Sequence, residues 1–185
     1  MNQKVPLPQR ILDMEAEQMA MIENLLLGSD VGLGTALVVI AVVPAVCEEV
    51  FFRGYLHRQV ERVGGGLVAA VAVGTLFGLF HLRLTQALPL VALGIYFGVL
   101  VWATGSLWIP IAAHFLNNGA QVLFAFWAKE QPDFSPEQLE SVSIPWYLVG
   151  ASVLGMAWII NALAQRRRAR IERGEGMGTT PTGAA

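Results

Sequence analysis

Long runs of apolar residues, interrupted by short polar islands, dominate the chain from about residue 31 onward. A helix of roughly 20 apolar residues crosses the roughly 30 Å hydrocarbon layer of a bilayer. The pattern therefore predicts five spanning helices, at residues 32–54, 65–82, 88–104, 108–128 and 145–164. The third begins after Pro89 only if residues 82–88 are a non-helical entry to it.

Residues 9–28 follow a different pattern, in which apolar and acidic residues alternate with a helical period. The apolar positions are Ile11, Leu12, Met14, Met19, Ile22 and Leu26, and the acids are Asp13, Glu15, Glu17 and Glu23. This pattern predicts an amphipathic helix in the membrane interface. The small, glycine-rich residues after Ile171 are typical of disorder. We therefore divide the chain into an interfacial helix (1–30), a membrane core (31–165) and a basic, then disordered tail (166–185).

The composition supports a membrane protein. Hydrophobic residues make up 55% of the 185 positions and charged residues 14%, against about 25% charged in soluble domains. We expect an all-α, polytopic transmembrane bundle of one domain. The net charge of −2 and the lack of a basic face outside the tail argue against nucleic-acid binding. The single Cys47 cannot form a disulfide within the chain, and we interpret it as small core filler.

Orientation follows from the arginines of the tail, which are Arg166, Arg167, Arg168, Arg170 and Arg173. The positive-inside rule places this tail in the cytoplasm, and five spans then place the N-terminus outside. Residues 129–143 carry more acids than bases, as expected of an outer loop. The start of the chain lacks the pattern of a cleavable signal peptide, so we expect the first span to act as its own insertion signal.

Three polar islands lie within these apolar runs. Glu48 and Glu49 follow an apolar segment that is expected to lie in the lipid. A charge in the hydrocarbon costs roughly 2.5–3.5 kcal/mol on insertion scales, so intramembrane acids usually mark function. Arg53 lies four residues after Glu49, the spacing of an ion pair within a helix, which leaves Glu48 chemically available. The glycines at 64–66 predict a tight turn between two antiparallel helices, which would put Glu48 and His81 at the same height.

His114 and Asn118 form the third island, four residues apart on one helix face. Straight helices would place them about 15 Å from the level of Glu48 and His81 at a rise of about 1.5 Å per residue. A non-helical segment 82–88 would have to remove that offset. The remaining histidine, His57, is read as an interfacial residue at the end of its helix.

The chemistry that fits these islands is hydrolysis. A carboxylate and a neutral imidazole, here Glu48 and His81, can together deprotonate a water molecule. His114 and the Asn118 amide can donate to the oxygen that gains charge in the tetrahedral intermediate. Glu48, His81 and His114 also form a plausible three-ligand zinc set with water in the fourth position. The chain has no HExxH motif, and the sequence leaves both mechanisms open.

Together the islands resemble a known family. The segments EEVFFR (48–53), FGLFH (77–81) and HFLNN (114–118) match the EExxxR, FxxxH and HxxxN motifs of the CPBP family, the intramembrane proteases related to type II CAAX prenyl endopeptidases and bacteriocin-immunity proteins. The resemblance covers about residues 33–125. It implies that Glu48 and His81 activate water, Glu49 with Arg53 supports Glu48, and His114 with Asn118 stabilises the oxyanion.

This resemblance implies an intramembrane endopeptidase of a cell membrane, such as a bacterial inner membrane, with several spans and a cytoplasmic C-terminus. Its substrate would be a membrane protein or a lipidated peptide, its surroundings the lipid bilayer, and it would need no cofactor, with zinc as the alternative. The chain could act as an oligomer. The competing hypothesis is a non-proteolytic scaffold or immunity protein whose polar core only holds the bundle together. A transporter fits less well, because no paired half-helices are visible.

Overall fold

The protein is described by a computed structural model that covers residues 7–27 and 31–131, together with residues 155, 158–166, 168–169 and 172–173. Within these ranges all regular secondary structure is helical, which confirms the predicted all-α class. The first helix, α1 (Gln9–Leu27), coincides with the predicted amphipathic helix. Most of the predicted fifth span, residues 145–164, lies outside the described residues.

One continuous helix of 32 residues, Leu33–Gly64, carries the acidic island. It comprises α2 (Leu33–Ala36), the π-helical segment η1 (Leu37–Val42), α3 (Val43–Glu49), a second π-helical segment η2 (Val50–Leu56) and α4 (His57–Gly64). Pro44 lies just after η1, and a proline lacks the N–H that an α-helix needs at that position. The predicted end at residue 54 is wrong, because the following residues favour a helix and no breaker occurs before Gly64.

The predicted turn between the first two helices is confirmed. Gly65 has φ 79°, a backbone conformation that glycine adopts easily, and α5 (Gly66–Phe80) starts directly after it. The chain therefore reverses within one residue, and α4 packs against α5. After α5, a short 3₁₀ turn, η3 (Leu84–Gln86), leads into α6 (Ala87–Thr104), and α7 (Trp108–Lys129) follows.

Glycines allow α5 and α6 to pack closely along their whole length. A Cβ atom added at Gly74 would lie 2.4 Å from the Ile95 nitrogen, and one at Gly94 would lie 2.5 Å from the Gly74 oxygen. Gly94 and Gly98, spaced four residues apart on α6, therefore allow close helix packing. This contact fixes the height of α6, including the backbone carbonyl of Gly94, relative to α5.

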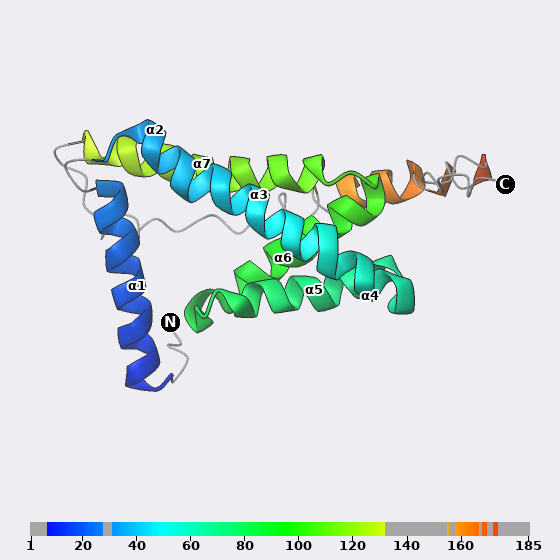
Figure 1. Cartoon of the computed structure of the whole chain (residues 1–185), viewed down its shortest axis with the longest axis horizontal. Coiled ribbons are helices and arrows are strands. Elements are labelled where there is room, and N and C mark those ends of the chain that lie inside the picture. The colour runs from blue at the N-terminus through cyan, green and yellow to red at the C-terminus, as the bar shows by residue number, and fades with distance from the viewer. Residues whose placement is uncertain are drawn as a thin grey trace, which may run out of the picture.

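The helices form two layers, which Figure 1 shows one above the other. The long helix crosses α7 in one layer, with contacts along η1 and α3, and α5 pairs with α6 in the other. The long helix passes from the first layer to the second through η2 and α4. At the end of the molecule away from α4, α1 lies across both layers, contacting α7 and reaching the turn between α5 and α6.

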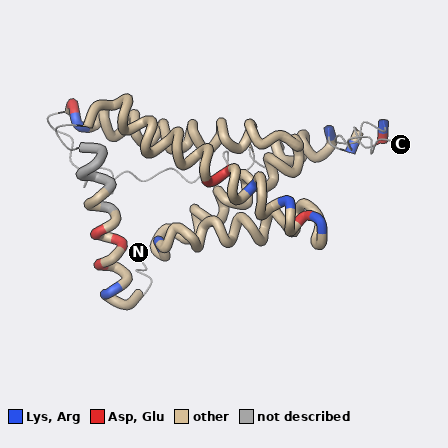
Figure 2. Tube along the Cα trace, viewed as in Figure 1, with Lys and Arg blue, Asp and Glu red and all other residues tan. Residues whose placement is uncertain are grey.

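The arrangement suits a membrane protein. Among the described residues, Leu33–Gly64 and Leu84–Thr104 are long and apolar enough to cross a bilayer, and Gly66–Phe80 is apolar but shorter. Figure 2 shows the charged residues concentrated on α1, on the long helix and near the chain ends, whereas α5, α6 and α7 are almost free of them. The predicted second, third and fourth spans coincide with α5, α6 and α7, and their crossing of the bilayer stays a prediction.

Candidate active site

The three polar islands meet between the two layers. Glu49 and Arg53 lie on the long helix with fully buried side chains, and Arg53 Nη1 donates to Glu49 Oε1 at 2.8 Å. Arg53 Nη2 donates to the carbonyl oxygen of Gly94 on α6, also at 2.8 Å. The ion pair predicted from the spacing of four residues is therefore present. It also ties the long helix to α6.

His114 joins the same carboxylate from α7. Its Nδ1 lies 3.0 Å from Glu49 Oε1, and because an ionised carboxylate only accepts, Nδ1 carries the proton. The buried imidazole stacks on Phe97, with ring centroids 5.2 Å apart and planes at 25°. We call Glu49, Arg53, His114 and the Gly94 carbonyl the closed side of the site. It connects the long helix, α6 and α7.

Glu48 faces a different surrounding. Its side chain is 32% exposed, and its Oε2 lies 4.0 Å from Nε2 of both His81 and His114. Within the described residues Oε2 has no hydrogen-bond partner. Glu48 and His81 form what we call the open side of the site. The prediction that Glu48 and His81 lie at one level, with Glu48 left free by the Glu49 pair, is confirmed in its geometry.

A backbone contact fixes the imidazole of His81. Nδ1 lies 2.8 Å from the carbonyl oxygen of Phe77, one turn earlier on α5. A carbonyl oxygen only accepts, so Nδ1 must donate and the neutral ring keeps its lone pair on Nε2. That lone pair is on the ring nitrogen nearest Glu48. His81 is thereby held in the tautomer that a general base needs.

Phe77 packs in the middle of this cluster. Its ring is fully buried, lies 4.5 Å from the Arg53 guanidinium carbon, and contacts the rings of His81 and His114 at centroid distances of 4.7 and 5.9 Å. A cation over an aromatic face is stabilised by the ring quadrupole. Phe77 therefore supports Arg53 and packs against both imidazoles.

Asn118 lies one turn beyond His114 and contacts a different group. Its Nδ2 donates to the carbonyl oxygen of Ile40 at 3.1 Å, and its Oδ1 accepts from Asn117 at 3.1 Å. Ile40 lies four residues before Pro44, which has no N–H for the usual α-helical bond to that carbonyl. One amide hydrogen of Asn118 thus binds η1 to α7, and the other is available for the predicted oxyanion role.

The offset of His114 expected from straight helices is removed by the turn after α5. Leu82 has φ 54°, and the chain passes through η3 before α6 begins at Ala87. This displaces α6, and with it the start of α7, so that His114 reaches Glu49 rather than lying about 15 Å away, as straight rods predict. The predicted non-helical entry is confirmed for residues 82–83, but it is wrong for the rest of 82–88, because residues 84–86 form a 3₁₀ turn and α6 begins at Ala87, before Pro89.

The alternative zinc set can be compared with these distances. A tetrahedral site with bonds of about 2.0–2.2 Å places its ligand atoms about 3.3 Å apart, whereas Glu48 Oε2 lies 4.0 Å from each imidazole nitrogen. No three His, Cys, Asp or Glu side chains in the described part of the chain are close enough to hold a metal ion. Both imidazoles nevertheless have a fixed Nδ1 donor, as metal-binding histidines do.

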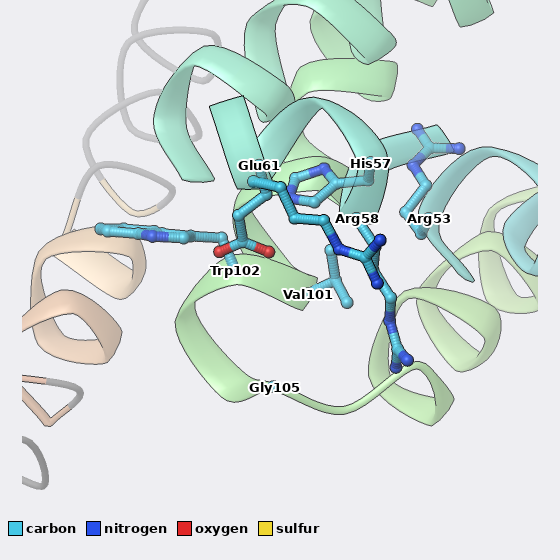
Figure 3. Close-up of a pocket in the computed structure, with 8 residues that line it drawn as sticks. Arg53, His57, Arg58, Glu61, Val101, Trp102 and Gly105 are labelled. Atoms are coloured by element: carbon cyan, nitrogen blue, oxygen red, sulfur yellow. The ribbon is translucent and has the colours of Figure 1, made fainter. Parts of the chain in front are cut away.

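A second feature lies on the other side of Arg53. A cavity of about 590 Å³ opens beside α4 and the end of α6, and Figure 3 shows the guanidinium of Arg53 directed away from the side chains of Glu61 and Trp102. His57 lines this cavity and is 1% exposed. The reading of His57 as an interfacial residue at a helix end is wrong, because the helix continues and packs it inside. Cys47 is also exposed rather than core filler.

Sequence reasoning missed two contacts of the site. The link between His114 and Glu49 joins residues 65 positions apart, and Asn118 and Ile40 are 78 apart. Pro44 was the available signal for the second, since a proline inside a helix leaves the carbonyl four residues earlier without its α-helical donor.

Comparisons with known proteins agree with the three motifs. Residues 31–120 match the family model described as type II CAAX prenyl endopeptidase Rce1-like. The chain is also similar to a Bacillus subtilis (strain 168) protein named "Putative membrane peptidase YdiL", with 31% identity over 86 residues. That match covers 44% of this chain and 34% of the relative, so the chain corresponds to about a third of the relative's length. No solved structure matches the chain. These two matches support the assignment of residues 31–120, just under half of the chain, to the CPBP family, whose motifs lie at 48–53, 77–81 and 114–118.

Proposed function

We propose that the protein is an intramembrane endopeptidase in which Glu48 and His81 activate the water that hydrolyses a peptide bond. The observation that carries this proposal is the position of Glu48 Oε2, 4.0 Å from Nε2 of both His81 and His114. These gaps are too long for direct hydrogen bonds. One water molecule at about 2.8 Å from each atom fits between Glu48 and His81.

The chemical sequence follows from the fixed tautomers. Glu48, with His81, takes a proton from the bound water as its oxygen attacks the carbonyl carbon of the substrate. The oxyanion that forms needs donors, and His114 donates from Nε2 only in its doubly protonated form, because Nδ1–H already binds Glu49. The free amide hydrogen of Asn118 is the second proposed donor. The proton held by Glu48 and His81 then passes to the leaving amine as the C–N bond breaks.

Glu49 and Arg53 support this chemistry without taking part in the bond changes. Glu49 binds Arg53 and His114 through the same oxygen, so the position of His114 depends on the ion pair. Arg53 is further held by the Gly94 carbonyl. We therefore propose that the closed side is the frame that holds the imidazole of His114, whose Nε2 lies 4.0 Å from Glu48 Oε2.

We further propose a multi-pass orientation with the basic tail in the cytoplasm and a membrane protein or lipidated peptide as substrate. The matched family is named for CAAX prenyl endopeptidases, but no contact in this structure selects a prenyl group. The apolar exterior supports a substrate that approaches through the lipid, since residues such as Val38, Val50 and Phe80 are exposed on the helices around the site.

The competing hypothesis is a scaffold or immunity protein. A scaffold would need the closed side, because it joins three helices. It would not need Glu48, whose Oε2 has no hydrogen-bond partner among the residues that the structure describes. The discriminating experiment compares the membrane and secreted proteomes of cells carrying the wild type, Glu48→Ala or the matched acid variant Glu130→Ala, from the end of α7. We expect at least one cleavage product to disappear only in Glu48→Ala. Identical proteomes would favour the scaffold.

The metal question needs a separate measurement. We expect the purified protein to bind less than one zinc ion per chain and to keep its activity in a chelator. If zinc is bound stoichiometrically, and its removal and return abolish and restore activity, Glu48, His81 and His114 act as zinc ligands that close onto the ion. In that case Glu48 holds the metal rather than the water.

A further inference from the structure

A carboxylate of α1 binds the turn that follows His81. Glu15 Oε1 accepts from the backbone N–H of Leu84 at 2.6 Å and from that of Thr85 at 3.3 Å. Glu15 Oε2 accepts from the hydroxyl of Thr85. Glu15 is 7% exposed, the most buried of the described acids of α1. One side chain thus takes three donors from a segment about 70 residues away in the sequence.

The bound turn determines where His81 lies. His81 directly follows α5, and three residues later η3 begins with Leu84. Between them Leu82 adopts φ 54°, a left-handed conformation that costs a leucine of order 1 kcal/mol or more and persists only where surrounding contacts hold it. Within the turn, the Leu82 N–H donates to the Leu79 oxygen and the Gln86 N–H donates to the Arg83 oxygen, each at 3.1 Å. The N–H groups of Leu84 and Thr85, which lie between them, donate to Glu15.

We propose that Glu15 is a positioning residue for His81: by clamping the turn 82–86 to α1, it holds the imidazole at its distance from Glu48. This inference rests on the proposed function in so far as His81 is the base. The clamp comes from outside the segment that matches the family model, which begins at residue 31. The amphipathic helix then has a specific task beyond binding the membrane surface, because it completes a site formed by the other helices.

The surroundings of Glu15 keep the clamp closed at neutral pH. The hydrogen bond from the Thr85 hydroxyl, which outweighs burial, holds the pKa of Glu15 below its ordinary value of 4.5, and the backbone donors and Arg83 act in the same direction. The carboxylate is therefore ionised, and all three donors meet a charged acceptor, the stronger form of hydrogen bond.

In Figure 1, α1 stands beside the end of the molecule where α5 turns into α6.

The test uses variants that open the clamp from both sides. Glu15→Gln removes the charged acceptor, and Thr85→Val removes the hydroxyl donor while keeping the charge of Glu15. The matched control is Glu17→Gln, which removes an exposed acid from the same helix. Two measurements that need no substrate are made on the intact protein in detergent: amide hydrogen exchange of residues 82–86, and the ¹⁵N signals of the His81 ring, which are resolvable among only three histidines.

We expect exchange in the turn to rise by about tenfold to a hundredfold in Glu15→Gln, the ratio expected for a lost hydrogen bond to a charged group, and less in Thr85→Val. The His81 ring signals should move in both variants and stay unchanged in Glu17→Gln. Thr85→Val keeps the negative charge of Glu15. If the His81 ring signals move in both variants, the cause is therefore a changed position of the ring and not the loss of that charge. If a substrate is in hand, kcat should fall with KM unchanged.

Three results separate the possibilities. If hydrogen exchange of residues 82–86 and the His81 ring signals in Glu15→Gln equal those in Glu17→Gln, Glu15 does not clamp the turn. Faster exchange with unmoved His81 signals would show that Glu15 holds the turn without positioning His81, which also overturns the proposal. If the wild type cleaves nothing, the proposed function fails, while the His81 signals still decide whether Glu15 positions that ring.

Discussion

The two sides of the polar cluster contain adjacent glutamates with opposite surroundings. On the closed side, Glu49 is fully buried, and one of its oxygens binds both Arg53 and His114. On the open side, Glu48 is 32% exposed, and its Oε2 makes no direct hydrogen bond to any residue that the structure describes. Neighbouring residues on a helix point about 100° apart, which is enough to direct one carboxylate into the helix contacts and the other toward His81.

This difference separates structure from chemistry within one motif. A buried charge whose partners are all protein groups holds helices together, and removing a partner strands the remaining charge. A carboxylate beside an imidazole with an oriented lone pair contributes less to stability than the buried carboxylate does. It is better placed to act as a base. We therefore expect substitutions on the open side to reduce turnover in a folded protein, and substitutions on the closed side to reduce folding first.

The largest expected effect concerns the imidazole of the open side. His81→Gln should lower turnover by about 10²–10⁴-fold, the usual contribution of a positioned base. The bundle should stay folded, because His81 is 30% exposed and, among the described residues, its ring hydrogen-bonds to the Phe77 carbonyl one turn earlier. The matched control is His57→Gln, a buried histidine outside the cluster. Turnover per folded molecule should survive in that control. Equal losses in both variants would remove the distinction between His81 and an ordinary core histidine.

A substitution on the closed side should act on stability. Arg53→Ala leaves Glu49 buried without its guanidinium partner, and breaking a buried pair in this way costs about 3–5 kcal/mol. We expect a large fall in expression and in the unfolding midpoint, with activity lost in proportion to the folded fraction. Arg58→Ala, an exposed arginine of α4, is the control. If the Arg53→Ala protein is stable but inactive, Arg53 takes part in the reaction rather than in folding.

A smaller effect should come from the backbone that supports the closed side. In Gly94→Ala, the added Cβ would lie 2.5 Å from the Gly74 oxygen, so α5 and α6 must separate and the Gly94 carbonyl must move from Arg53. Overpacking of this kind costs about 1–3 kcal/mol. Gly34→Ala, whose Cβ meets nothing within 4 Å, should be neutral or stabilising. Equal unfolding midpoints for the two variants would contradict the close packing.

The smallest expected effect is that of low pH on hydrogen exchange in the turn 82–86. Because the pKa of Glu15 is lowered in the folded protein, its contribution is fully present above its ordinary value of 4.5 and is lost as the pH falls through the lower folded value. Hydrogen exchange of the turn 82–86, corrected for its intrinsic pH dependence, should stay constant from about pH 8 to 5 and rise only in stronger acid. A rise already near pH 6 would show that another group controls the turn.

The parts of this site that the sequence predicts are those set by local geometry. The Glu49–Arg53 pair follows from a spacing of four residues on one helix, and the level of Glu48 with His81 follows from a turn at Gly65. The contacts of His114 and Asn118 depend on how the turn after α5 displaces α6 and α7. That path depends on an acid in α1 about 70 positions away, which helical periodicity does not reveal.

The extension of the first helix to Gly64 was missed for another reason. Its last residues are polar, and hydropathy marks where a helix leaves the hydrocarbon rather than where it ends. Burial of His57 is a consequence of that extension, since the extra turns pack against α5.

The most direct test of the division of roles between the two glutamates measures turnover and thermal unfolding of Glu48→Gln and Glu49→Gln in the same preparation, with a substrate identified from the proteome comparison. We expect Glu48→Gln to keep the wild-type unfolding midpoint and to lose turnover by about 10²–10⁴-fold. Glu49→Gln should lower the midpoint, because Arg53 and His114 lose a charged partner. Near wild-type turnover in Glu48→Gln, or a molecule that Glu48→Gln unfolds and Glu49→Gln does not, would contradict this division of roles.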